Sequence, residues 1–272
     1  MLEALPVRYL GLLAALLTAG AVQPAVADTE VDLELVLAVD VSRSMDFGEL
    51  EVQRRGYVAA FRNPEIIDAI SSGFTGSIAV IYLEWAGSFY QTVVVPWRII
   101  AGPEDAEAFA AELDQAPILR ERGTSISGGL LFAARQFADN EVVGTRHTID
   151  ISGDGTNNTG APVAPMRDQL VEQGITINGL PILIRPSQTG PFGTAELDIY
   201  YEDCVIGGPG SFMITVDSVE RFEIAIRRKL VLEIAGLPPH LMLAADGMRA
   251  EPRIDCLIGE KSRGRYLDPF IR

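Results

Sequence analysis

Five side chains from three separate parts of the sequence could together hold a divalent cation. Each stands where an apolar strand ends or a helix begins, and the five are Asp40, Ser42, Ser44, Thr124 and Asp154. All of them offer oxygen, and a hard cation such as Mg²⁺ binds about six oxygens in near-octahedral order. Two carboxylates and three neutral hydroxyls leave such an ion short of charge and open to an outside ligand. The pattern therefore predicts a cation site that can capture a ligand.

A simpler interpretation of the first motif needs no metal ion. Asp40 can cap the turn that follows it, because a carboxylate accepts hydrogen bonds from backbone N–H groups. Ser42 and Ser44 would then be polar loop residues in contact with water. A site that keeps these side chains without binding an ion belongs to the same alternative, and the pattern alone leaves both interpretations open.

The segments that carry these residues predict a buried sheet. Val31–Val41 is almost continuously apolar, as in a central strand that is covered on both faces, and Arg146–Ser152 and Ile175–Ile184 are further strands. Because strands alternate with helices, we expect a doubly wound α/β fold, with a mostly parallel sheet and helices on both faces. Such sheets bind ligands beyond the carboxyl ends of their strands, where Asp40 and Asp154 stand.

The remaining segments extend this pattern. Ser77–Ala86 and Phe89–Trp97 predict a hairpin, and Pro96 favours an antiparallel edge position for the second strand. Ser211–Val216 is predicted to be the last strand. The predicted helices are Phe47–Arg62, Glu65–Ser72, a helix that Gly102-Pro103 opens, Ser125–Ala138, and one that runs from Pro165 at its first position to Gln173.

The last predicted helix has the clearest local signals. Asp217 and Glu220 have the spacing of a capping box, which begins a helix. An apolar face extends over Val219–Ile234, and Gly236 stops the helix. We expect the basic run from Arg227 to Lys229 to be a solvated helix end, near the negative end of the helix dipole.

The order of the three metal-site motifs resembles the von Willebrand factor A domain and its metal-ion-dependent adhesion site (MIDAS). That family has Asp-x-Ser-x-Ser after the first strand, a Thr before a later helix, and an Asp at the end of the fourth strand. The resemblance covers about residues 31–235, and the matching positions are Asp40, Ser42, Ser44, Thr124 and Asp154.

The resemblance implies that these residues contact the ion in two different ways. Ser42, Ser44 and Thr124 would contact the ion directly, whereas Asp40 and Asp154 would hold it partly through water. The family and the oxygen-only set both indicate Mg²⁺ or Mn²⁺. The open position would accept a carboxylate from an unidentified protein or peptide partner, and the last helix would move when that ligand binds.

Two features depart from the family pattern. Gly153 stands where a Thr usually precedes the final Asp, and the segment Asp198–Gly210, which contains Cys204, is not a general feature of A domains. These features resemble a bacterial exported subfamily of unknown function. The resemblance therefore carries over the site but identifies no partner.

Two other acidic residues are candidates for supporting the site. Asp150 lies on a buried-looking strand, and burying a charge is costly unless the charge is paired. It could orient a hydroxyl of the metal site, or it could bond to a neighbouring helix, and the sequence favours neither. Asp46 closely follows the first motif and is the candidate general base if the metal activates water for hydrolysis.

The amino terminus predicts export. Tyr9–Val22 is apolar and Ala25-Val26-Ala27 is a small-x-small cleavage site, so we expect residues 1–27 to be a signal peptide. The alternative is an uncleaved anchor, although the run is short for a bilayer span of about 20 residues. Residues 28–236 would form the A-like domain and residues 237–272 a C-terminal extension. The mature protein would be periplasmic or secreted, without stable membrane insertion.

Two cysteines, Cys204 and Cys256, are expected to pair in an exported protein. Their disulfide would tie the C-terminal extension to the region after the last core strand. The alternative is a pair of buried free thiols.

Composition limits the possible partners and functions. The chain has 272 residues, 48% of them hydrophobic, and a net charge of −15, which argues against nucleic acid or an anionic membrane surface as a direct partner. A metal-dependent binding module is the leading interpretation. A hydrolase is less favoured, because His147 and His240 belong to no recognisable triad and no His or Cys set for zinc is present. The third option is an exported structural domain that the metal only stabilises.

Overall fold

A five-stranded sheet forms the centre of the protein in the computed structural model, which describes residues 29–138, 140–184, 196–236 and 251–267. The strand order is β4-β3-β2-β6-β7, and every neighbouring pair is parallel except β3 and β4. This confirms the predicted parallel sheet with one antiparallel edge strand. The strands are β2 (Leu33–Asp40), β3 (Ile78–Trp85), β4 (Gln91–Ile100), β6 (His147–Gly153) and β7 (Ile175–Pro181).

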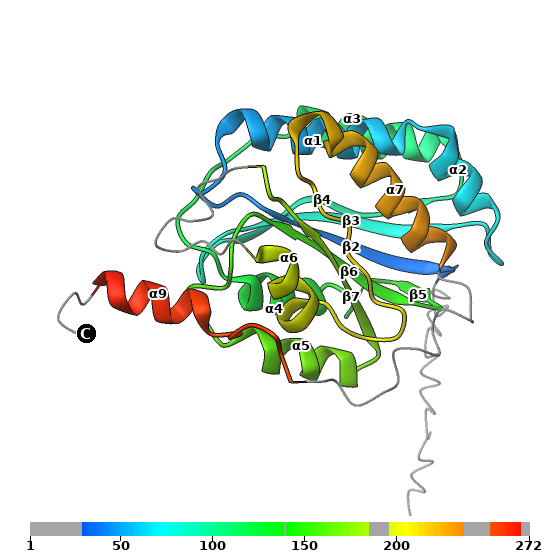
Figure 1. The fold of residues 1–272 in the computed structure, drawn as a ribbon. Coiled ribbons are helices and arrows are strands. Elements are labelled where there is room, and N and C mark those ends of the chain that lie inside the picture. Colours follow the sequence, from blue (N-terminus) through cyan, green and yellow to red (C-terminus); the bar gives the residue numbers. More distant parts are fainter. Residues whose placement is uncertain (1–28, 139, 185–195, 237–250, 268–272) are drawn as a thin grey trace, which may run out of the picture.

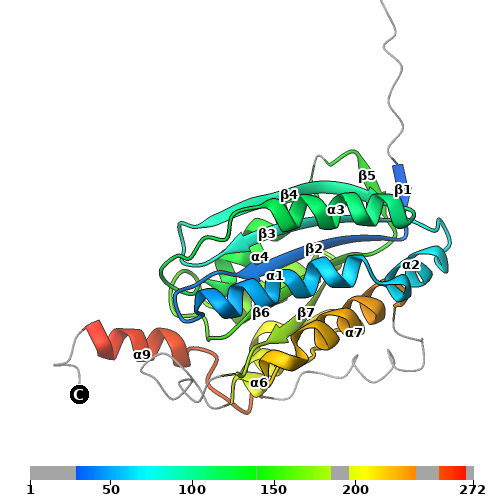
Figure 2. The ribbon, with the colours of Figure 1, turned by 90° about the horizontal axis from the view of Figure 1, so that it is seen from above.

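Helices cover both faces of this sheet, as Figures 1 and 2 show. One face carries α1 (Phe47–Phe61), α2 (Pro64–Ser71), α3 (Pro103–Gln115) and α7 (Phe222–Ala235). The opposite face carries α4 (Ile126–Arg135), α5 (Val163–Glu172) and the short α6 (Leu197–Tyr200), which continues into the π-helix η2 (Tyr201–Val205).

The central strand β2 is buried along its whole length because both faces are covered. Successive side chains of a strand point to opposite faces. Leu35 and Leu37 accordingly pack into the core beneath α1, α3 and α7, whereas Val36 and Ala38 pack into the core beneath α4 and α5. The continuous apolar run in the sequence reflects this double burial.

The predicted start of the last helix is wrong. The α-helix α7 begins at Phe222, after a 3₁₀ turn at Val219–Arg221, and Asp217 forms an ion pair with Arg221 at 2.9 Å instead of a capping box. Val219 is 40% exposed, so Phe222 is the first apolar side chain of the helix to reach the core. The predicted stop at Gly236 is confirmed, with φ of +74°.

The predicted exposure of the basic run is wrong at Lys229, which is completely buried. Lys229 stands three positions after Ile226, so both lie on the same side of α7. Arg228 is exposed, and Arg227 lies 3.7 Å from a Glu65 carboxylate oxygen. Arg227 and Arg228 therefore reach the surface, but the run lies in the middle of α7, so its predicted position at the helix end is wrong.

Two other predicted elements differ in the structure. Residues 211–216 form no strand but make single bridges to the β7 region, Gly179 with Met213 and Ile182 with Val216. The helix α5 begins at Val163, so Pro165 lies in its first turn and not at its first position. Proline is tolerated there because the first N–H groups of a helix have no intrahelical acceptor.

Three further features of the fold were not predicted from the sequence. A small parallel pair joins β1 (Thr29–Val31) to β5 (Val142–Gly144), α6 and η2 follow β7, and α9 spans Ile258–Leu267 in the C-terminal extension. The predicted signal peptide, residues 1–27, lies outside the described residues. Among the described residues, no helix is both long enough and apolar enough to cross a bilayer.

Candidate metal site

Two neighbouring strands bring the acidic residues of the predicted site to one edge of the sheet. Asp40 is the last residue of β2, and Asp154 follows Gly153, the last residue of β6. The two strands are parallel neighbours, so their carboxyl ends meet at this edge. Thr124 stands before α4, whose N-cap is Ser125, and Ser125 is held to the end of β3 by a hydrogen bond from its N–H to the Ala86 carbonyl oxygen, 2.7 Å long.

Hydrogen bonds link four of the five predicted residues in series. The Ser42 backbone N–H donates to Asp40 Oδ1 at 2.7 Å. The hydroxyl oxygens of Ser42 and Ser44 are 2.7 Å apart, and the Ser44 hydroxyl donates to Asp154 Oδ1 at 2.5 Å. Asp40 and Ser42 are buried, whereas Ser44 is exposed, so the series runs from the interior to the surface.

The fifth residue, Thr124, lies beside the Asp154 loop. A Cβ added to Gly155 would be 3.9 Å from Thr124 Oγ1. The preceding residues run along the first motif, because Glu121 pairs with Ser42 as an isolated bridge and its N–H donates to the Val41 carbonyl oxygen at 2.9 Å. All three motifs therefore meet at the carboxyl edge.

The electrostatics of Asp40 fit a bound cation. Burial, and then the nearby charge of Asp154, raise the pKa of Asp40 well above its usual range. Its second oxygen, Oδ2, is buried without a hydrogen-bond donor among the described residues. A buried carboxylate needs a counter-charge or a proton. A hard divalent ion, held by this oxygen-only donor set, would supply that counter-charge to Asp40.

Tyr201 is a residue of this site that the sequence did not reveal. A Cβ on Gly153 would lie 2.8 Å from the Tyr201 hydroxyl and 2.9 Å from Asp40 Oδ2, so no side chain fits there. Burial, and then the charge of Asp40, raise the pKa of Tyr201 well above its usual range. The two departures from the A-domain pattern, Gly153 and the inserted segment, are therefore coupled, and together they were the available signal for Tyr201.

The two candidate supporting residues have different surroundings. Asp46 is the N-cap of α1 and accepts from the Glu49 N–H at 2.9 Å, while the Glu49 carboxylate accepts from the Asp46 N–H at 2.9 Å. Asp150 is buried on β6, 2.6 Å from the Lys229 ammonium of α7. Two roles were considered for Asp150. Its contact with Lys229 corresponds to the second, an interaction with a neighbouring helix.

The loop after Asp154 is held by the C-terminal helix α9. Asn158 Oδ1 accepts from the Thr124 N–H at 3.1 Å and from Arg263 Nη1 at 3.3 Å. Asn157 Nδ2 donates to Glu260 Oε1 at 2.7 Å. A Cβ on Gly259 would overlap the Asn157 carbonyl oxygen, so the helix lies directly against the loop. Figures 1 and 2 both place α9 at the end of the molecule opposite β5.

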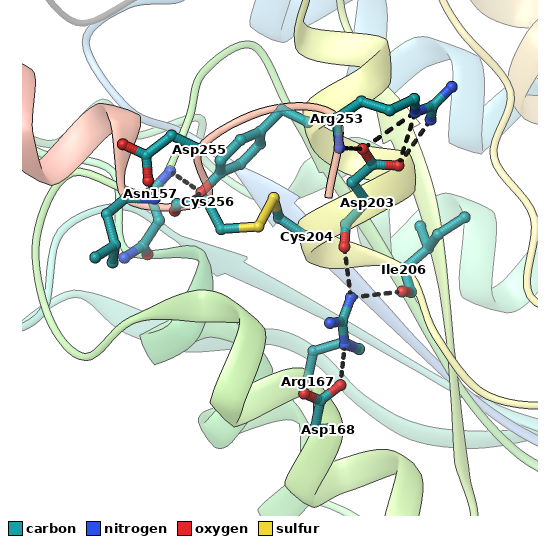
Figure 3. Close-up of a disulfide and its surroundings, with 11 residues drawn as sticks. Asn157, Arg167, Asp168, Asp203, Cys204, Ile206, Arg253, Asp255 and Cys256 are labelled. Atoms are coloured by element: carbon teal, nitrogen blue, oxygen red, sulfur yellow. Dashed lines mark hydrogen bonds and ion pairs between the residues drawn. A yellow bond between two sulfur atoms is a disulfide. The ribbon is translucent and has the colours of Figure 1, made fainter. Parts of the chain in front are cut away.

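A disulfide fixes the start of this extension to η2. The predicted Cys204–Cys256 bond is confirmed, with the two Cα atoms 5.5 Å apart. Figure 3 shows Arg253 beside it, donating from Nη2 to Asp203 Oδ1 at 2.7 Å, and Arg167 Nη1 donating to the Asp203 carbonyl oxygen at 3.1 Å. The disulfide and the Arg253 ion pair therefore anchor the extension beside the site.

Among the described residues, no group of three or more His, Cys, Asp or Glu side chains could hold a metal ion. An ion at the carboxyl edge would therefore depend on hydroxyl oxygens and water as well as on carboxylates. This suits hard cations better than a typical zinc centre, which uses His and Cys ligands.

The strand order and the two helical layers define a von Willebrand factor A fold. The chain belongs to the family described as "Protein of unknown function (DUF1194)", which matches residues 30–238. No curated protein matches the sequence.

Solved A-type structures share this fold at low sequence identity. Proximal thread matrix protein 1 from the mussel byssus is 16% identical, with a TM-score of 0.54 over 76% of this chain and 49% of its own. A von Willebrand factor type A protein from Catenulispora acidiphila is 15% identical, with a TM-score of 0.51 over 75% of this chain and 43% of its own. This chain thus spans less than half the length of these proteins.

A second structure of the mussel protein, with a TM-score of 0.51 and 15% identity over 76% of this chain and 49% of its own, has a zinc-occupied MIDAS motif. At such identities the likeness to these proteins establishes the fold alone.

Proposed function

We propose that this protein is an exported, metal-dependent binding module that uses Mg²⁺ or Mn²⁺ to capture a carboxylate of a protein or peptide partner. The observation that carries the proposal is the series of hydrogen bonds from Asp40 through Ser42 and Ser44 to Asp154. These side chains come from the ends of two strands, and the buried Asp40 Oδ2 has no donor among the described residues. A divalent ion would offset the two carboxylates and leave positions for Thr124, water and a ligand.

Three further observations support this proposal. The metal in the MIDAS motif of the mussel protein shows that this fold can hold a divalent ion at that motif. The oxygen-only donor set of this chain favours Mg²⁺ or Mn²⁺ over zinc. The Cys204–Cys256 disulfide supports export, because disulfides persist in oxidising compartments.

Calorimetric titration of the full chain with MgCl₂ and with MnCl₂ tests the metal site. We expect one ion per chain, and we expect Ser42→Ala/Ser44→Ala to lose that binding because two hydroxyl ligands are removed. The matched control is Ser71→Ala/Ser72→Ala, a pair of exposed serines whose hydroxyls bond to carbonyl oxygens of α2. Binding that survives in the Ser42/Ser44 variant would contradict the proposal.

Capture of exported proteins on the immobilised full chain tests the partner. A true partner should be retained in Mg²⁺, released by EDTA, and absent with Asp40→Ala. If Asp40→Ala lowers the melting temperature sharply and no EDTA-sensitive partner is found, the metal has a structural role and the binding proposal fails.

A further inference from the structure

Four arginines gather around the carboxyl edge that carries the candidate metal site. Arg43 lies inside the first motif, and Arg263 comes from α9. Arg120 and Arg122 belong to the segment that precedes Thr124. Arg43 and Arg122 are exposed, and the other two are partly exposed. The four come from three separate parts of the chain, as the predicted ligands do.

Side-chain contacts hold two of these arginines next to the site. Arg120 Nη2 donates to the Arg43 carbonyl oxygen at 2.5 Å, and its guanidinium carbon lies 5.8 Å from the centre of the Phe47 ring. Arg263 Nη1 donates to Asn158 Oδ1, the same oxygen that accepts from the Thr124 N–H. Both arginines therefore lie close to the predicted ligands.

None of these four arginines forms an ion pair within the described part of the chain, although the net charge is −15. Many arginines elsewhere are paired, such as Arg62 with Glu107, Arg98 with Glu112 and Arg253 with Glu202. Four other arginines of the described residues also lack an ion pair. Arg55, Arg135 and Arg228 lie singly on α1, α4 and α7, and Arg146 donates to the carbonyl oxygens of Glu233 and Ile234.

Acidic residues also lie near the arginine group. Glu121 lies between Arg120 and Arg122, Asp46 and Glu49 cap α1, and Glu260 of α9 accepts from Asn157 Nδ2. A divalent ion would offset Asp40 and Asp154. With the ion bound, the four guanidinium groups would still lack an ion-pair partner among the described residues, and such cations attract anionic ligands.

Exposed apolar side chains lie at the same edge. Phe47 is 55% exposed and Leu119 is 47% exposed. Phe89, in the turn between β3 and β4, is fully exposed, and its neighbour Gly87 packs against the Arg122 carbonyl oxygen. Aromatic residues and arginine are the side chains most enriched at the centres of protein interfaces.

We propose that this edge recognises an acidic peptide segment of a protein partner, with one carboxylate on the metal ion and others on the group of Arg43, Arg120, Arg122 and Arg263. The proposal rests on the proposed function and specifies the ligand class for that same site. The arginines select for several carboxylates around the one that the metal binds, because a single carboxylate satisfies the ion alone.

Two fluorescent probe peptides of equal length test this directly. Both contain one central Asp, which glutamates flank in the first and glutamines flank in the second. With the full chain and Mg²⁺ at low salt, fluorescence anisotropy should show tighter binding of the glutamate peptide, by about twofold to fivefold for each arginine engaged. The preference should shrink as salt rises, since exposed charges are screened.

A charge-matched pair of variants locates the preference. Arg43→Gln/Arg122→Gln should reduce the preference for the glutamate peptide to near one, whereas Arg55→Gln/Arg135→Gln, which removes two exposed charges from α1 and α4, should leave it unchanged. Calorimetry with MgCl₂ alone should show one Mg²⁺ ion per chain in both variants, so that a lost preference is not a lost metal ion.

The outcomes separate this inference from the proposed function. Equal binding of the two peptides, binding of neither peptide by the Mg²⁺-loaded protein, or a preference that survives Arg43→Gln/Arg122→Gln would overturn the acidic-peptide inference alone. A wild-type chain that binds no Mg²⁺ or Mn²⁺ would overturn the proposed function on which the inference rests.

Discussion

Asp40 and Asp150 are both buried carboxylates on neighbouring parallel strands, yet the protein surrounds them differently. Asp150 lies 2.6 Å from the buried ammonium of Lys229, which also pairs with Glu233 one turn further along α7. Asn178 Nδ2 donates to Glu233 Oε1 at 3.0 Å. Asp40 stands at the end of its strand, and its Oδ1 accepts from the Ser42 N–H. No group among the described residues donates a hydrogen bond to its Oδ2.

The charge of Asp150 is offset by a cation of the protein itself, whereas the surroundings of Asp40 fit an ion from outside. Asp150 lies within the length of β6, where α7 can cover it with its own cation. Asp40 lies where β2 stops, beside the Ser42 loop, Asp154 and Tyr201 of η2. A carboxylate inside a regular element is thus paired by packing, whereas one at a strand end faces the position where ligands bind.

Removing the internal cation should have the largest effect. Lys229→Met leaves Asp150 and Glu233 buried without a positive partner, so we expect the free energy of unfolding to fall by about 3–5 kcal/mol in urea denaturation. The control Arg228→Met changes the exposed neighbour and should stay within about 0.5 kcal/mol of the wild type. A Lys229→Met protein as stable as the wild type would show that Lys229 is not needed to offset the buried carboxyl groups.

The same cluster should make stability depend on pH. Burial, and then the charge of Asp150, raise the pKa of Glu233 from 4.5 to about 7. Between these values the folded protein keeps a proton that the unfolded chain has lost, so stability falls as pH rises. The groups that share this environment are Asp150, Lys229, Asn178, Tyr57 and Arg146.

Glu233→Gln removes this titration while it keeps a carbonyl oxygen for Asn178 and Lys229. Relative to the wild type, the variant should gain up to about 3 kcal/mol between pH 4.5 and pH 8. Thermal unfolding measured across this range checks the difference. A constant difference between the two proteins would mean that Glu233 does not hold the proton.

Metal ions should distinguish the two carboxylates. At a Mg²⁺ concentration of about 100 times Kd, the wild type should gain about 2.7 kcal/mol of stability. Asp40→Asn should gain none and should be at least as stable without metal, because it loses an uncompensated buried charge. Asp150→Asn should do the reverse, losing stability without metal and keeping the gain from Mg²⁺. Thermal unfolding with and without MgCl₂ measures the stability of both variants and their gain from Mg²⁺. The same response in both variants would show that Asp40 and Asp150 do not differ in metal binding.

The smallest effect is expected where α9 supports the loops around Asp40. In Gly259→Ala the new methyl group would overlap the Asn157 carbonyl oxygen, so we expect a local loss of about 1–3 kcal/mol. Nothing lies within 4 Å of a Cβ on Gly264, so Gly264→Ala is the matched control within the same helix. Amide hydrogen exchange over residues 156–159 should speed up in the first variant only. Equal amide exchange rates in both variants would show that α9 does not support the loops around Asp40.

Much of the fold could be predicted because its signals are local. The double burial of β2 appears as a continuous apolar run, and Pro96 marks the edge strand. The places of Asp40 and Asp154 follow from the ends of those runs. Their role as metal ligands stays a prediction that the calorimetric titration tests.

Long-range contacts account for what the sequence did not reveal. Lys229 stands in a basic run that is typical of an exposed helix end, and only the position of Asp150 across the interface makes its burial favourable. Tyr201 reaches the site because a π-helix follows α6, and no apolar periodicity predicts such a turn. The helix α9 carries few apolar residues, so its docking depends on contacts with the Asn157 loop and on the disulfide.

Hydrophobic periodicity and motif position predict the sheet, its carboxyl edge and the oxygen-bearing side chains at that edge, because both are properties of neighbouring residues. Contacts between distant segments establish that Lys229 pairs with Asp150, that the Tyr201 hydroxyl fills the space beside Gly153, and which arginines lie around the edge. These outcomes depend on surfaces far apart in the chain, and their energies arise only when those surfaces meet.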